Sequence, residues 1–80
     1  MARSQSNEPY AMRSGCKVGW YYYRTKAAAL RASAKAKATA IRRAEQGYDF
    51  GFCSPGAIRF IDPAENPKSA YRGLWEVTVP

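Results

Sequence analysis

A row of basic side chains is the feature of this sequence best suited to binding chemistry. Its four members are spaced by 7, 4 and 7 positions, so on a helix of 100° per residue they lie within about 40° of one another. At 1.5 Å per residue the row spans about 27 Å. Such a row can follow a phosphate backbone or contact an acidic protein surface. The alternative is a solvated face without a partner, although such faces usually mix glutamate with lysine. The four residues are Arg24, Arg31, Lys35 and Arg42.

Two further cations and two tyrosines are secondary candidates for the same kind of contact. Lys37 falls close to the apolar stripe of the expected helix, where it can extend past a sheet edge or reach a partner, and Arg43 lies in the closing turn. Tyr21 and Tyr23 are two positions apart on an expected strand, so they point the same way. Tyrosines beside a basic side chain can stack unpaired bases or anchor a protein interface. Strand surfaces also favour tyrosine without any partner.

The charge of the chain is unevenly distributed. Its 80 residues include 13 Lys or Arg and 6 Asp or Glu, which gives a net charge of +7. Positions 9–44 hold nine of the basic residues and no acid, so the rest of the chain carries a charge of −2. This asymmetry indicates a basic face with a polyanionic or acidic partner.

The residue types needed for catalysis or for a cofactor are missing. The sequence has no histidine, which excludes Ser-His and Cys-His nucleophile pairs and His-ligated zinc. Its acids show no spacing for a metal or for paired carboxylate chemistry, and no glycine-rich loop precedes the helix. Cys16 and Cys53 match no metal spacing. We expect both to be reduced, partly buried thiols, although an oxidised pair stays open because both fall at expected strand ends. The expected protein is therefore not an enzyme and holds no cofactor or metal.

The chain divides into two parts by composition. Residues 1–14 are mostly polar and predict a flexible N-terminal tail, and residues 15–80 are long enough for one small domain. No run approaches the ~18 apolar residues of a membrane span, and the N-terminus lacks the apolar stretch of a secretory signal. These features predict a soluble, cytoplasmic protein.

The longest predicted element is a helix over residues 26–46. Nine of the eighteen residues at positions 27–44 are alanine, which favours helix most strongly. Thr25 is the candidate N-cap, and Gly47 stands where a glycine commonly ends a helix. Leu30, Ala34 and Ile41 share one stripe, which we expect to pack against a sheet.

Four strands are expected around this helix. Aromatic and β-branched residues with a period of two predict them, and Ser, Pro and Gly at positions 54–56 predict a hairpin turn between the second and third. The strands are 17–23, 48–53, 57–61 and 74–79. One helix can cover only one sheet face, so bulky side chains must fill that face and the other stays open. The bulk is expected from Trp20, Phe50, Phe52, Ile58 or Phe60, and Trp75, and the open face from Tyr21, Tyr23, Arg59, and Glu76 or Thr78.

The predicted fold class is therefore α+β, with two layers. One long α-helix packs on a mainly antiparallel four-stranded sheet, in the order β-α-β-β-β. This layout resembles the small phage-encoded inhibitors of bacterial immunity, in particular the anti-CRISPR proteins, in architecture and size over residues 16–80.

The resemblance implies a non-enzymatic phage or mobile-element inhibitor. Such a protein acts in the host cytoplasm by occluding a CRISPR–Cas-type complex, which is a host protein or ribonucleoprotein, as a monomer or weak dimer and without a membrane. Because this chain is basic, its helix would meet an acidic Cas surface or the bound nucleic acid. Two alternatives stay open. One is a small DNA- or RNA-binding protein that uses the basic row and the tyrosines, and the other is a structural component of a larger particle.

Overall fold

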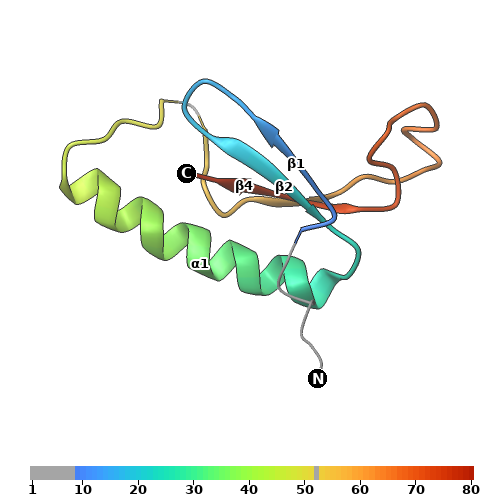
Figure 1. The fold of residues 1–80 in the computed structure, drawn as a ribbon, viewed down its shortest axis with the longest axis horizontal. Coiled ribbons are helices and arrows are strands. Elements are labelled where there is room, and N and C mark those ends of the chain that lie inside the picture. The colour runs from blue at the N-terminus through green and yellow to red at the C-terminus, as the bar shows by residue number, and fades with distance from the viewer. Residues whose placement is uncertain (1–8, 52) are drawn as a thin grey trace.

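One helix lies across one face of a four-stranded antiparallel sheet (Figure 1). The structure, a computed structural model, describes residues 9–51 and 53–80. The sheet has the order β1-β2-β4-β3, and the molecule is only 16 Å across its shortest axis. The predicted α+β class, with one long helix on four strands, is confirmed. The elements are β1 (Ala11–Ser14), β2 (Gly19–Tyr23), α1 (Lys26–Glu45), β3 (Ile58–Phe60) and β4 (Trp75–Val79).

The order of elements along the chain differs from the prediction, because a strand precedes β2. Residues 11–14 were predicted to belong to the tail, but they form the edge strand β1, which pairs with β2 from Ala11 opposite Tyr22 to Ser14 opposite Gly19. The Gly15 amide donates to the Val18 carbonyl at 2.8 Å and closes the turn between them. The chain therefore runs β-β-α-β-β. Of the rest of the predicted tail, positions 9 and 10 are described and the Tyr10 amide donates to the Tyr22 carbonyl at 2.7 Å, whereas residues 1–8 lie outside the described residues.

The strand predicted over residues 48–53 is wrong for the described part of that segment. Asp49 Oδ1 accepts a hydrogen bond from the Gly51 amide at 2.8 Å, and Gly51 has a φ of +66°. A side chain that bonds the backbone two residues on is typical of a turn. Phe52 lies outside the described residues, and the expected hairpin at 54–56 is replaced by a turn that leads into β3.

Both ends of α1 match their sequence signals. The Thr25 hydroxyl accepts a hydrogen bond from the Ala28 amide at 3.2 Å, so Thr25 is the N-cap. The helix ends at Glu45, one residue earlier than predicted, and Gly47 follows with a φ of +93°. Arg42 and Arg43 lie in the last turn, where cations stabilise the carbonyl end of a helix.

The face of α1 that packs on the sheet is not the predicted one. Leu30 and Ile41 are 51% and 63% exposed, so the predicted stripe faces solvent. The sheet supplies large side chains at this interface, such as Tyr23 and Val77, and we infer that only small residues let the helix approach closely enough to bury them. The buried residues of α1 are Ala28, Ala29, Ser33 and Ala36.

The tyrosines of β2 also lie on the face opposite to the predicted one. Tyr21 and Tyr23 pack in the core beneath the helix, together with Ile58 and Trp75, whose place there was predicted. Trp20 points away from the helix, against Tyr22 in a second cluster with Ile61 and Leu74. The segment between β3 and β4 supplies that cluster, so it covers part of the face that was expected to stay open. Phe50 belongs to neither cluster and contacts Tyr48, and Phe60 is largely exposed.

Candidate binding surfaces

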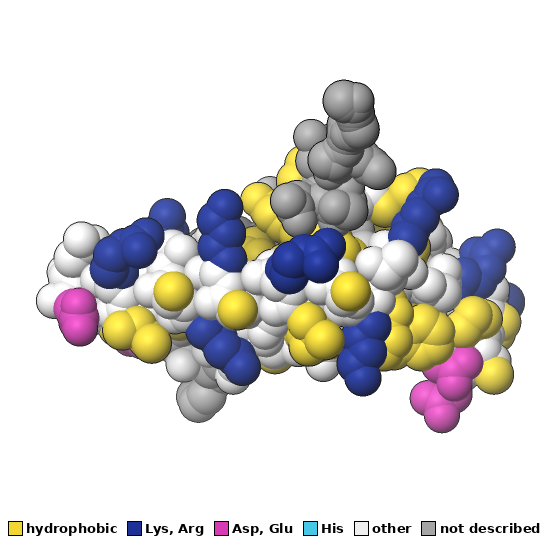
Figure 2. Space-filling model, turned by 90° about the horizontal axis from the view of Figure 1, so that it is seen from below, with side chains coloured by type: hydrophobic (Ala, Val, Ile, Leu, Met, Phe, Trp, Pro, Cys, Tyr) yellow, Lys and Arg dark blue, Asp and Glu magenta, His cyan; other side chains and the backbone are white. Residues whose placement is uncertain are grey.

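The exposed side of α1 combines an apolar row with cations on both sides. Figure 2 shows apolar side chains along the middle of the helix, with Lys and Arg above and below them. At 100° per residue, Lys26 and Lys37 fall on one side of the row, and three other cations of α1 fall on the opposite side. We call this surface the α1 solvent face. Its apolar row is Leu30, Ala34, Ala38 and Ile41, and its second cationic side is Arg31, Lys35 and Arg42, all of them exposed.

Three of the four residues in the predicted basic row belong to this face. The fourth, Arg24, precedes the helix, and its guanidinium lies over the Tyr10 ring at 4.2 Å from the centroid. The apolar stem of Lys37 lies against Gly56, beside the buried contact that the Ser33 hydroxyl makes to the Gly56 carbonyl. Arg43 is exposed in the last turn. The part of the basic row that lies within α1 is therefore Arg31, Lys35 and Arg42, and Arg24 lies just before the N-cap Thr25.

Two residues of this region were missed by sequence reasoning. The Lys26 ammonium lies 5.6 Å from the Trp75 ring centroid, and the Phe60 ring packs on Trp75 at 4.8 Å. Phe60 is 42% exposed, so exposed apolar surface continues from the first turn of α1 toward β3. The sequence signal for Phe60 was its aromatic side chain, which was assigned to the core, and Lys26 counted only among the nine basic residues of positions 9–44.

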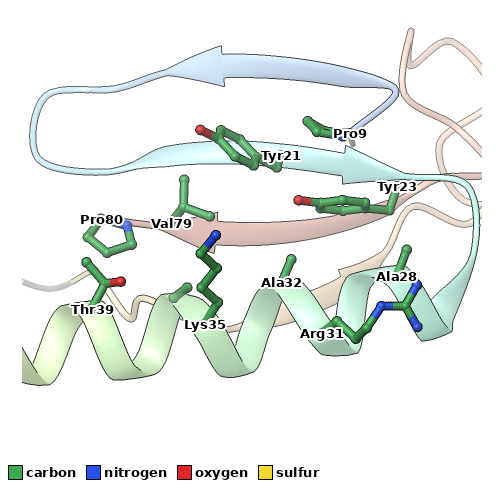
Figure 3. Close-up of a pocket in the computed structure, with 11 residues that line it drawn as sticks. Pro9, Tyr21, Tyr23, Ala28, Arg31, Ala32, Lys35, Thr39, Val79 and Pro80 are labelled. Atoms are coloured by element: carbon green, nitrogen blue, oxygen red, sulfur yellow. The ribbon is translucent and has the colours of Figure 1, made fainter. Parts of the chain in front are cut away.

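A groove of about 500 Å³ runs between β2 and α1. Figure 3 shows the rings of Tyr21 and Tyr23 on its β2 side and the Lys35 ammonium reaching across from the helix. The sequence placed the tyrosines and the basic row on different surfaces, whereas the structure brings them together. The lining is completed by Pro9, Ala28, Arg31, Ala32, Ala36, Thr39, Val79 and Pro80.

Tyr23 is the most buried polar side chain of the groove, at 4% exposure. Burial raises the pKa of its phenol above the ordinary value, and the neighbouring Tyr21 adds to that shift. The Tyr23 hydroxyl is therefore protonated at neutral pH and can donate a hydrogen bond. Within residues 9–51 and 53–80 no hydrogen bond to it is observed.

A polar network crosses the opposite face of the sheet. The Arg13 Nε donates to the Tyr22 hydroxyl at 3.0 Å, and that hydroxyl donates to Glu76 Oε2 at 2.8 Å. The Arg59 Nε lies 3.4 Å from Glu76 Oε1. Arg13 also lies over the rings of Trp20 and Tyr71. Arg59 and Glu76 were predicted for this face.

The groups in this network are electrostatically coupled. Burial raises the pKa of Tyr22, and its hydrogen bond to Glu76 raises it further, while the bond from Arg13 acts in the opposite direction. The hydrogen bond to Tyr22 is the main cause of the raised pKa of Arg13. The network therefore joins side chains from β1, β2, β4 and β3 on the face away from the helix.

The cysteines differ from their predicted environment. Cys16 and Cys53 are both free and exposed rather than partly buried, since each lies in a connecting segment outside the strands. In the described residues, no three His, Cys, Asp or Glu side chains are grouped as a metal site would require. No helix in the same residues is long and apolar enough to cross a membrane.

Comparisons with protein-family models, curated proteins and solved structures give no match. The resemblance to anti-CRISPR inhibitors stays a prediction from size and architecture. The geometry of the α1 solvent face and of the groove must therefore support any functional proposal.

Proposed function

We propose that the protein is a non-enzymatic binding protein whose α1 solvent face occupies an acidic surface of a partner protein. One observation carries the proposal. Leu30 and Ile41 are each more than half exposed, and they lie in a row between two sets of cations. Isolated exposed apolar residues are ordinary on protein surfaces, but an aligned row with a charged rim is the pattern of an interface.

The apolar row favours a protein partner over a phosphate backbone. Burial of a leucine or isoleucine side chain contributes about 1.5–3 kcal/mol, and a phosphate backbone offers no apolar surface for that burial. The flanking cations would orient the partner and speed its association through complementary charge. The partner surface should therefore hold an apolar strip with Asp or Glu on both sides.

A second copy of this chain does not fit the same face. The helix carries six Lys or Arg and a single acid, Glu45, at its last position. Two such faces would place like charges opposite one another, which disfavours association. The charge distribution thus supports a different, acidic molecule as the partner.

In its specific form the proposal is stoichiometric occlusion. By the resemblance described above, the partner would be a CRISPR–Cas-type or related nucleic-acid-processing complex in the host cytoplasm, and the protein would block a surface on it. The same face could also join the chain to a larger particle. The identity of the captured partner distinguishes these two forms.

Affinity capture from the native host, with point variants, tests the proposal. Leu30→Glu and Ile41→Glu place a charge in the apolar row, and we expect each to reduce partner recovery by about 10-fold or more, as interface hot spots do. Met12→Glu is the matched control, because Met12 on β1 is 62% exposed, close to the 63% of Ile41. We expect it to leave recovery unchanged.

Nuclease treatment of the lysate distinguishes a protein partner from direct binding to DNA or RNA. A protein partner should be recovered equally with and without nuclease. Recovery that disappears after nuclease, or that is the same for Ile41→Glu as for the parent protein, would contradict the proposal. The first result would favour direct DNA or RNA binding.

A further inference from the structure

The hydroxyl group of Tyr23 is a buried hydrogen-bonding group aimed into an open groove. The residue is 4% exposed, and Figure 3 shows its side chain extending along the space between β2 and α1. Among the described residues no protein group bonds this hydroxyl. Buried polar groups are nearly always hydrogen-bonded, and an unsatisfied one lowers stability. A bound molecule in the groove would supply the missing partner.

The groove also presents positive charge. The Lys35 side chain crosses from α1 toward β4, and Arg31 lies at the rim on the same helix (Figure 3). Among the described residues, no Asp or Glu side chain lines the groove. An anionic group such as a phosphate would therefore be favoured at the Lys35 end.

The remaining lining suits a flat apolar ring. Tyr21 is half-buried and presents an aromatic side chain, and Ala32 and Val79 contribute apolar surface beside it. Aromatic side chains in basic grooves stack nucleic-acid bases without regard to sequence. The volume of about 500 Å³ lies within the range of small-molecule sites.

We propose that this groove binds a nucleoside phosphate, either as a free nucleotide or as one nucleotide of a single strand. The base packs on Tyr21, a polar atom of the ligand accepts the hydrogen bond of Tyr23, and the phosphate pairs with Lys35. The site is distinct from the apolar row of the α1 solvent face, because Leu30 and Ile41 do not line the groove. Loss of partner docking through the apolar row and loss of ligand binding in the groove can therefore be measured independently.

A titration followed by amide nuclear magnetic resonance tests the site on the full chain. The probes are AMP, adenosine, inorganic phosphate and a single-stranded DNA of six adenines. We expect AMP or the oligonucleotide to shift the amides of the groove residues, and adenosine and phosphate to shift them far less. Binding of AMP alone identifies a free nucleotide as the ligand, and binding of the strand alone identifies single-stranded nucleic acid.

Three variants test the assigned contacts. Tyr23→Phe removes only the hydroxyl and should weaken binding by about 2- to 10-fold. Lys35→Met keeps an apolar stem without the charge and should weaken it by about 10-fold or more. Lys68→Met is the control, because Lys68 is an exposed cation outside the groove, and it should bind like the parent protein.

The proposal is overturned by any of three results. One is the absence of groove shifts with both AMP and the oligonucleotide, and another is equal shifts from inorganic phosphate and from AMP. The third is unweakened binding by Tyr23→Phe. If Tyr23→Phe does not fold, Tyr21→Leu replaces it, with an expected loss of about 5-fold or more from the missing ring.

Discussion

Tyr22 and Glu76 face each other across β2 and β4, and the Tyr22 hydroxyl donates to the Glu76 carboxylate at 2.8 Å. Arg13 on β1 extends this pair on one side, and Arg59 on β3 extends it on the other. One polar chain thus crosses all four strands on the face away from the helix. Tyr71 stacks on Tyr22 with ring centroids 4.0 Å apart, which shields the central bond from water.

Removal of the Tyr22 hydroxyl should destabilise the sheet. In Tyr22→Phe the buried Glu76 carboxylate loses a donor, and we expect the free energy of unfolding to fall by about 1–3 kcal/mol. Urea denaturation measures the change. Tyr48→Phe is the control, because the Tyr48 hydroxyl bonds the Lys17 carbonyl in an exposed setting at 3.2 Å. Equal losses in the free energy of unfolding for the two substitutions would contradict a stabilising role of the buried network.

The raised pKa of Tyr22 and that of Tyr23 predict a loss of stability at alkaline pH. The folded state holds these protons more tightly than the unfolded state, so unfolding releases protons and stability falls as pH rises. The contribution is fully present below the ordinary tyrosine pKa of about 10 and is lost above it, as pH passes the folded-state values. Urea midpoints between pH 8 and 11 should fall more steeply for the parent protein than for Tyr22→Phe. Parallel curves would contradict this role for Tyr22.

Two alanines of α1, two positions apart, should differ in their response to the same enlargement. Ala36 is 4% exposed against the sheet, so Ala36→Leu overpacks the interface and should reduce the free energy of unfolding by about 1–3 kcal/mol. Ala34 is exposed, and Ala34→Leu should change the free energy of unfolding by less than about 0.5 kcal/mol. Thermal denaturation of both variants measures the difference. The reverse order would mean that the helix packs through its Leu30 and Ile41 side after all.

The features predicted correctly from the sequence depend on short-range signals. The helix begins after Thr25 and ends before Gly47 because a capping hydroxyl and a left-handed glycine act within a few residues of the chain. The alternation of β2 and of β4 also gave the correct sets of side chains on each side of each strand.

The orientation of these elements depends on contacts between distant residues, which the sequence pattern does not contain. The hydrophobic side chains of Leu30 and Ile41 predicted that they pack in the core. The large side chains of Tyr23 and Val77 instead favour alanine where α1 packs on the sheet. The same error put Tyr21 and Tyr23 on the open face. The groove could therefore not be predicted, because its existence depends on those tyrosines facing the basic helix.

The role of the α1 solvent face in binding is tested most directly by site-specific photo-cross-linking in the native host. A photoreactive amino acid at Ala34 lies in the apolar row, whereas the same group at Ala70 lies in the exposed segment between β3 and β4. We predict a single protein adduct from position 34 that Arg42→Glu diminishes, and no such adduct from position 70. Equal adducts from both positions, or an adduct from position 70 alone, would contradict docking through α1.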